Sequence, residues 1–279
     1  MSLASLSARL PGKRAFITGA GSGLGLEFAR ALVGEGWAVG LFDVDPSRLA
    51  KAEEELSMQG ARVHAFPGDV RDHGELTVAV NSFADIVGGL DLMINNAGVA
   101  CAGSLLETPP EDWRWIVDIN VLGVVNGCRA GVPHLQRSGR GILINVASAA
   151  AFVSAPFMTP YNATKAAVLS IGESLAAELS GAGIQVSVAM PGFMNTSLLE
   201  TARGPDRERE IAEVSMRNSR YTAAAGARDI LLGAARGDMY IVLPKAMRNV
   251  WRFKRWLPDI FVRQFPHLRD RFMSKARGE

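Results

Sequence analysis

A glycine-rich turn between an apolar run and a helical pattern is the feature that most constrains the fold of this chain. Residues 14–18 have the composition of a short buried strand, Gly19-Ala-Gly-Ser-Gly-Leu-Gly25 follows, and apolar residues recur at helical spacing over 26–33. Glycines permit a tight turn and let backbone N–H groups approach a pyrophosphate at the N-terminus of the following helix. The segment therefore predicts a strand–turn–helix unit that binds phosphate.

Strand-like and helix-like segments alternate along the rest of the chain. Apolar runs predict strands at 14–18, 38–42, 62–66, 90–94, 141–147, 184–189 and 239–243, and helical patterns lie between them. One of these helical patterns is a long amphipathic stretch over 111–136. Seven strands separated by helices predict an α/β fold, a doubly wound parallel sheet covered on both faces. We expect a single domain over 1–244 and a helical C-terminal extension over 245–279.

The composition, 48% hydrophobic and 21% charged, is typical of a soluble globular protein and excludes a disordered or fibrous chain. Cys101 and Cys128 lack CxxC or metal-ligand spacing, so we expect free thiols, no disulfide framework and no metal site. The N-terminus has no apolar core of the ~7–15 residues that a signal peptide requires, which predicts a cytoplasmic protein. Residues 141–164 carry no charge, but Pro156 and Pro160 favour a strand and loop over a membrane span.

Asp43 follows the second predicted strand, eighteen residues after Gly25. An acid at this place can accept hydrogen bonds from the hydroxyls of an adenosine ribose, and it repels a 2′-phosphate. Position 44 is Val and position 22 is Ser, so neither usual place offers a cation for that phosphate. The pattern favours NAD over NADP. We expect Asp45 to cap the next helix, with Pro46 at its first position.

Ser148, Tyr161 and Lys165 have the spacing of a catalytic set. Ser148 ends the apolar run at 142–147, and Tyr161 and Lys165 lie four residues apart, on one face of a helix. A cation one turn from a phenol favours the phenolate, so the sequence predicts that Lys165 lowers the pKa of Tyr161 toward neutrality. The three side chains can then converge on one carbonyl or hydroxyl group of a substrate.

These motifs together resemble the short-chain dehydrogenase/reductase family, over roughly residues 11–244. The resemblance is carried by Thr18-Gly-Ala-Gly-Ser-Gly-Leu-Gly25, Asp69-Val70, Asn95-Asn-Ala-Gly98, Asn120, Ser148, Tyr161-x-x-x-Lys165 and Pro191-Gly192, in the order and spacing of the family. It implies a single Rossmann-like domain with a seven-stranded sheet, usually assembled as a homotetramer or homodimer.

The resemblance also implies roles for the catalytic set. Tyr161 resembles the general acid/base that exchanges a proton with the substrate oxygen, and Ser148 resembles the group that hydrogen-bonds that oxygen. Lys165 would hold the nicotinamide ribose, and Asn120 would hold a water that links Lys165 to solvent. For Asn120 the alternative is a polar residue that only caps a helix irregularity.

The residues implied for the cofactor follow the predicted strand ends. Asp69 and Val70 would flank the adenine, Asn96 would contact the adenosine side, and Thr196 would contact the carboxamide. The amides of Asn95-Asn96 are equally explained as structural cross-links between central strands. The cofactor-binding candidates are Gly19, Ser22, Gly23, Leu24, Gly25, Asp43, Asp69, Val70, Asn96, Tyr161, Lys165, Met194 and Thr196.

The loops beyond the predicted strand ends indicate the substrate class. They are apolar and contain no carboxylate or phosphate clamp, which favours a lipophilic secondary alcohol or ketone. These residues are Ala149, Ala150, Phe152, Val153, Phe157, Met158, Phe193, Met194, Leu198 and Leu199. The charged segment 197–226 predicts a lid, in which Arg203 is placed to meet an anionic substrate.

The predicted function is hydride transfer between a nicotinamide cofactor, NAD in preference to NADP, and such a small molecule. The alternative is a non-catalytic dinucleotide-binding regulator or scaffold. A scaffold would not need Ser148, Tyr161, Lys165 and Asn120 together, which weighs against that alternative.

The C-terminal extension differs from the body in charge. Residues 245–279 carry ten Lys or Arg and three Asp or Glu, a net charge of +7, so the rest of the chain carries −5. Val250, Phe253 and Leu257 form one helical stripe, with Trp251 and Trp256 beside it. This pattern suits peripheral contact with an anionic membrane, and equally an element that packs on a neighbouring subunit or covers the substrate entrance. The acidic body argues against nucleic acid as a partner.

Overall fold

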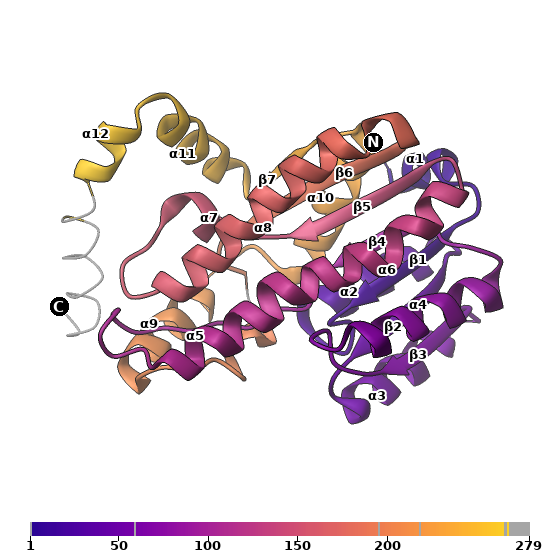
Figure 1. The fold of residues 1–279 in the computed structure, drawn as a ribbon, viewed down its shortest axis with the longest axis horizontal. Helices are drawn as coiled ribbons and strands as arrows, with labels where there is room; N and C mark the ends of the chain where they lie inside the picture. The colour runs from indigo at the N-terminus through magenta and orange to yellow at the C-terminus, as the bar shows by residue number, and fades with distance from the viewer. Residues whose placement is uncertain (1, 59, 195, 218, 265–266, 268–279) are drawn as a thin grey trace.

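The centre of the molecule is a parallel sheet of seven strands in the order β3-β2-β1-β4-β5-β6-β7 (Figure 1). The computed structural model describes residues 2–58, 60–194, 196–217, 219–264 and 267. The strands are β1 (Arg14–Thr18), β2 (Ala38–Asp43), β3 (Val63–Pro67), β4 (Leu92–Asn95), β5 (Gly141–Val146), β6 (Ile184–Pro191) and β7 (Tyr240–Leu243). The predicted doubly wound sheet is confirmed, and every strand bound lies within two residues of its expected position.

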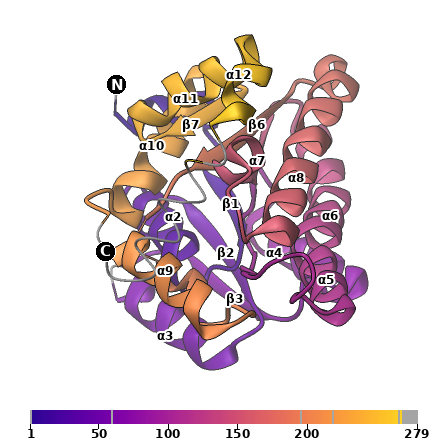
Figure 2. The same cartoon turned by 90° about the vertical axis from the view of Figure 1, so that its left-hand side faces the viewer.

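Helices cover both faces of this sheet, which is why the strands read as continuous apolar runs (Figure 2). One face is covered by α1 (Ala4–Arg9), α2 (Gly23–Val33), α3 (Pro46–Ser57) and α10 (Ala223–Arg236). The other is covered by α4 (His73–Val87), α6 (Gly123–Arg137) and α8 (Thr159–Glu178). A short 3-10 turn, η2 (Ser180–Ala182), joins α8 to β6.

The amphipathic stretch predicted over 111–136 is not one regular helix. It begins as α5 (Pro110–Val117), passes through a π-helical segment, η1 (Asp118–Leu122), and continues as α6. Asn120 lies inside the π-helical segment and is completely buried. Such segments occur frequently at functional sites, because the extra residue in the turn redirects a side chain.

The C-terminal ends of the strands form the edge at which a ligand is expected. The strand order reverses between β1 and β4, and in open parallel sheets ligands bind in the crevice outside the strand ends at such a switch point. At the paired ends of β4 and β5, Asn95 Nδ2 donates to Asn145 Oδ1 at 2.9 Å. This is the cross-link between central strands that one interpretation of the Asn-Asn-Ala-Gly run predicted.

Further segments lie over or beside this edge. They are α7 (Ala150–Val153), the lid segment with η3 (Ser197–Leu199) and α9 (Asp206–Arg217), and the extension with α11 (Lys245–Trp256) and α12 (Pro258–Arg263). Residues 265–266 and 268–279 of the predicted extension lie outside the described residues. Among the helices described, none has the length and apolar character needed to cross a membrane. The division of the chain at residue 244 remains a prediction.

Candidate active site

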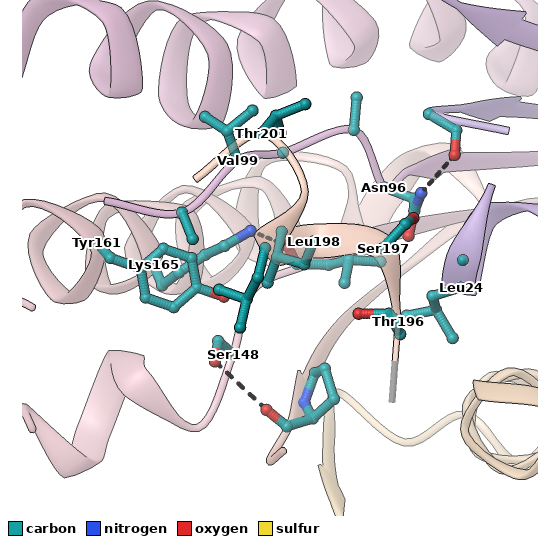
Figure 3. Close-up of a pocket in the computed structure, with 18 of the residues that line it drawn as sticks. Leu24, Asn96, Val99, Ser148, Tyr161, Lys165, Thr196, Ser197, Leu198 and Thr201 are labelled. Carbon is teal, nitrogen blue, oxygen red and sulfur yellow. Dashed lines mark hydrogen bonds between the residues drawn. The ribbon is translucent and has the colours of Figure 1, made fainter. Parts of the chain in front are cut away.

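Three side chains from two elements meet at the C-terminal edge of the sheet. Ser148 follows β5, and Tyr161 and Lys165 project from the first turns of α8 (Figure 3). Ser148 Oγ accepts a hydrogen bond from Ala150 N at 3.1 Å and donates to Pro191 O at 3.3 Å, which fixes its orientation. The Ser148 hydroxyl also lowers the pKa of Tyr161. The structure therefore brings the three predicted side chains together, and their chemical roles remain predictions.

Burial controls the ionisation of Tyr161 and Lys165. Lys165 Nζ donates to Val146 O at 3.0 Å and lies 5.8 Å from the centre of the Tyr161 ring. Burial lowers the pKa of Lys165 to about 8. Burial also raises the pKa of Tyr161, and the hydrogen bond with Ser148 offsets only part of that rise. The pKa of Tyr161 is therefore raised and not lowered as expected: burial raises it, and Ser148, not Lys165, is the group that lowers it.

Asn120 connects the segment after β4 to α8. Its Oδ1 accepts from Val99 N at 2.8 Å, and its Nδ2 donates to Val99 O at 2.9 Å and to Thr164 Oγ1 at 3.2 Å. Thr164 precedes Lys165, so Asn120 braces the turn that presents the ammonium. Its place in a π-helical segment accords with the structural alternative for this residue. Its role in holding a water remains a prediction.

The glycine turn between β1 and α2 is held in a shape that side chains would prevent. Gly19 has a φ of +65°, and a Cβ at Gly25 would collide with the carbonyl oxygen of Gly19. Asn96 Nδ2 donates to Thr18 O at 3.0 Å and to Gly19 O at 3.1 Å. Asn96 therefore holds the turn in place, and its predicted contact with adenosine remains a prediction.

Asp43 lies over the same turn. Its Oδ2 accepts from Gly21 N at 2.8 Å and its Oδ1 accepts from Asp45 N at 3.0 Å, so the carboxylate is fixed beside the glycine loop. Asp45 caps α3, accepting from the backbone N–H groups of Ser47 and Arg48, as the sequence predicted. The carboxylate of Asp43 is therefore placed to accept hydrogen bonds from a bound ribose.

Arg48 is a residue of this site that the sequence reasoning missed. It lies in the first turn of α3 and lines the same cavity as Asp43. Its guanidinium pairs with Asp45 at 3.2 Å and with Glu200 of the lid at 2.9 Å. The two usual places for a cation near the adenosine ribose, positions 22 and 44, hold Ser and Val. An Arg three residues after a capping Asp was the available signal, because residues so spaced meet on a helix.

One cavity of about 920 Å³ joins the glycine turn to the Tyr161 hydroxyl. This is near the upper end of the ~300–1,000 Å³ that small-molecule sites usually occupy. The predicted residues that line it are Gly19, Ser22, Gly23, Leu24, Asp43, Asp69, Val70, Asn96, Ser148, Tyr161, Lys165, Met194 and Thr196. Gly25 and Asn120 lie behind its wall.

The substrate end of the cavity is apolar, with two differences from the predicted set. Ala149, Ala150, Val153, Met158, Phe193, Met194, Leu198 and Leu199 line it as expected. Phe152 and Phe157 are not among its lining residues, so that part of the prediction was wrong. The wall is completed by residues that sequence spacing did not indicate: Val99, Ala100, Trp115, Ile119, Met216, Ala246 and Met247. They come from the segment after β4, from α5 and η1, from α9 and from α11.

The lid segment is tied to the glycine turn at one end and to α5 at the other. Ser197 Oγ lies 2.8 Å from Ser22 Oγ, within hydrogen-bond distance. Arg203 pairs with Asp112 of α5 at 2.8 Å and stacks on the Trp115 ring at 4.1 Å. Arg203, which was predicted to meet an anionic substrate, therefore contacts a carboxylate of the protein itself at the rim of the cavity.

Comparison with known proteins identifies the family. The family model described as short chain dehydrogenase matches residues 13–206. The chain belongs to the short-chain dehydrogenase family. It is 33% identical over 190 residues to 2-(R)-hydroxypropyl-CoM dehydrogenase of Xanthobacter autotrophicus, covering 67% of this chain and 76% of that one. It is 35% identical over 202 residues to the probable oxidoreductase EphD of Mycobacterium tuberculosis, covering 69% of this chain and 33% of EphD. The chain thus matches about a third of the length of that protein.

A solved structure supports the fold of this short-chain dehydrogenase. A short chain dehydrogenase/reductase from Burkholderia phymatum in complex with NAD superposes with a TM-score of 0.85 and 29% identity, covering 90% of this chain and 96% of that one. The residues present fit a nicotinamide dinucleotide, because the glycine turn leaves its backbone open to a pyrophosphate and one cavity continues from that turn to Tyr161. The fold and the site are therefore those of a short-chain dehydrogenase, with a cavity that fits a nicotinamide dinucleotide.

Proposed function

We propose that this enzyme uses NAD in preference to NADP to interconvert a lipophilic secondary alcohol and its ketone. The observation that carries the proposal is the continuous cavity that has Asp43 and the glycine turn at one end and Ser148, Tyr161 and Lys165 at the other. A dinucleotide held along this length would place its nicotinamide near Ser148, Tyr161 and Lys165, which line the substrate end of the cavity.

The chain's own residues supply binding and proton transfer. The nicotinamide, when bound, supplies the hydride chemistry. When substrate is bound, the Ser148 hydroxyl turns from Pro191 O to donate its hydrogen bond to the substrate oxygen. Tyr161 transfers a proton between its hydroxyl and that oxygen. Lys165 orients the cofactor ribose, and Asn120 fixes the turn of α8 from which Lys165 projects.

The preference for NAD rests on Asp43. Its fixed carboxylate accepts hydrogen bonds from ribose hydroxyls and repels a 2′-phosphate. Arg48 lies close enough to attract such a phosphate, but its guanidinium is already paired with Asp45 and Glu200. The two pairs reduce the net positive charge that Arg48 presents, which supports the choice of NAD.

The substrate class rests on the walls of the cavity. Val153, Met158, Phe193 and Leu198 surround the space in front of Tyr161, and apolar walls favour an apolar substrate. The name of the Xanthobacter relative describes a dehydrogenase of a hydroxypropyl compound, which accords with an alcohol as the substrate. We further propose a homotetramer or homodimer located in the cytoplasm, where Cys101 and Cys128 remain free thiols.

The test is oxidation of secondary alcohols of increasing alkyl length, and reduction of the matching ketones, with NAD(H) and NADP(H) side by side. We expect turnover with NAD(H) that improves as the alkyl chain lengthens. Better turnover with NADP(H) would overturn the assignment to Asp43. Tight binding of NAD without turnover of any alcohol or ketone would favour the regulator or scaffold instead.

A further inference from the structure

The C-terminal helices α11 and α12 form an arm that projects from the body beyond β7 (Figure 1). The inner face of α11 packs on the body through Met247, Val250 and Trp251, and Arg255 stacks on Trp251 at 5.1 Å. α12 folds back on α11, with the Phe253 and Phe261 rings 6.0 Å apart. The arm is therefore packed against the body and has a defined orientation.

The outer side of the arm is apolar and exposed. Trp256 is 82% exposed, and Leu257, Ile260 and Val262 are each nearly half exposed. Helical spacing places Arg252, Phe253 and Trp256 together on the side of α11 opposite to the face that packs on the body. Soluble proteins rarely expose so many large apolar side chains in one place without a partner.

The charge of the arm indicates what kind of partner it binds. Arg252 and Arg263 are exposed on the arm, and Asp259 is its single acidic residue between 245 and 264. The extension carries +7 while the remainder of the chain carries −5, so the cations are concentrated on this element. Tryptophan beside aliphatic residues and cations is the composition of helices that lie in the interface of an anionic bilayer.

We propose that the outer side of the arm, formed by Arg252, Trp256, Leu257, Ile260 and Arg263, docks on the surface of an anionic lipid bilayer. Two alternatives fit the structure less well. A second copy of the arm would bring a like charge of +5 (six Lys or Arg and one Asp over 245–263) to the same surface, and a nucleic acid would leave the exposed aliphatic side chains unburied. Because Ala246 and Met247 of α11 line the cavity, docking holds the cavity close to the membrane. Binding to lipid does not depend on the proposed reaction.

The test is co-sedimentation of the full-length protein with vesicles of phosphatidylcholine alone or mixed with phosphatidylglycerol. We expect binding to the mixed vesicles only, reversed by salt. Two double variants separate the two contributions. Trp256→Ser/Ile260→Ser removes the apolar contact with the bilayer, and Arg252→Glu/Arg263→Glu reverses the charge of the arm's outer side. Since each basic residue near such a surface contributes ~1 kcal/mol, loss of two should raise the lipid concentration for half binding by about thirtyfold or more.

Matched variants on the body serve as controls. Met58→Ser/Leu106→Ser removes exposed apolar side chains, and Arg140→Glu/Arg228→Glu reverses exposed charges, and both should bind vesicles as the native protein does. The proposal is overturned by a native protein that does not bind the mixed vesicles, or by arm variants that bind as the controls do. An oligomer that Trp256→Ser/Ile260→Ser dissociates, without vesicle binding by the native protein, would assign the surface to a second copy.

Discussion

Lys165 and Tyr161 lie one turn apart on α8, with the Lys165 ammonium 5.8 Å from the centre of the Tyr161 ring and both side chains buried. Burial acts in opposite directions on their pKa values, lowering that of Lys165 to about 8 and raising that of Tyr161. Near neutral pH the pair therefore consists of a protonated phenol beside an ammonium that loses its proton easily. The phenol therefore carries a proton near neutral pH and can act as an acceptor only after it loses that proton at higher pH.

The lowered pKa of Lys165 predicts a dependence of stability on pH. A lysine titrates near 10.5 when unfolded and about 8 in the native protein, so burying its charge destabilises the fold below pH 8 and this penalty fades as pH rises to 10.5. The Lys165→Met variant lacks this penalty. The gain in its unfolding free energy, compared with that of the native protein at the same pH, should therefore be about 2 kcal/mol larger at pH 7 than at pH 10. Urea unfolding at the two pH values measures this difference. The substitution removes the hydrogen bond to Val146 O at both pH values, so the loss of that bond cancels in the comparison. Equal differences at pH 7 and pH 10 would mean that Lys165 stays hydrated.

The raised pKa of Tyr161 predicts the pH profile of the reaction. Oxidation of an alcohol needs the unprotonated phenol, so kcat/KM for oxidation should rise with pH from 6 through 9. Reduction needs the protonated phenol and should stay level over the same range. Ser148→Ala removes the hydrogen bond that lowers the pKa, so its oxidation profile should move to higher pH. An oxidation profile that is level between pH 6 and pH 9 would contradict the direction assigned to Tyr161.

Replacement of the phenol tests whether Tyr161 transfers the proton. Tyr161→Phe should lower kcat by about 10²–10⁴-fold, which is the usual contribution of a general acid/base, while the Kd for NAD changes little. Tyr221→Phe is the matched control, because Tyr221 bonds Asp229 outside the cavity. Steady-state kinetics and a cofactor titration on the same preparations provide both values. Activity of Tyr161→Phe equal to that of Tyr221→Phe would remove Tyr161 from the reaction.

The sheet could be predicted because each buried strand is a local apolar run. The apolar run at 14–18 coincides with β1, whereas the run at 90–94 begins two residues before the first residue of β4. Leu90 and Asp91 precede β4, and both are buried, Leu90 in the core and Asp91 in its pair with Arg14. A buried residue just outside a strand has the same apolar signature as one inside it, so strand bounds are less certain than strand existence.

The proximity of Tyr161 and Lys165 could be predicted for the same reason, and the lid contacts could not. Tyr161 and Lys165 lie on one helix, so their spacing alone places them together. The partners Arg203 and Asp112 are 91 residues apart, and no local pattern joins them. The π-helical segment was not predicted for the same reason. The side chain of Asn120 hydrogen-bonds the backbone of Val99, 21 residues earlier in the chain, and no local pattern indicates this contact.

Asp43 should set the choice of cofactor. Asp43→Ser removes the acceptor for ribose hydroxyls and a negative charge that repels a 2′-phosphate, so the Kd for NAD should rise about tenfold and the Kd for NADP should fall. Asp72→Ser is the charge-matched control, since Asp72 caps α4 and does not itself line the cavity. Fluorescence titration with both cofactors measures the ratio. An unchanged ratio would show that another group, Arg48 first, governs the preference.

Arg203 should hold the lid closed at the substrate end of the cavity. Its guanidinium pairs with Asp112 and stacks on Trp115, and the backbone of Arg203 bonds the segment after β4 through Ala100 and Ala102. Arg203→Ala removes the ion pair and the stacking, which together contribute about 1 kcal/mol at a half-exposed site, so the open lid should be populated several-fold more.

Limited proteolysis then cuts the lid segment several-fold faster, and KM rises more than kcat falls, because an open lid binds substrate less well. Arg220→Ala is the control, since Arg220 is exposed and outside the cavity. Asp112→Asn should reproduce part of the effect, because the stacking of Arg203 on Trp115 survives in it. Cleavage of Arg203→Ala at the rate of Arg220→Ala would show that backbone pairing alone keeps the lid in place.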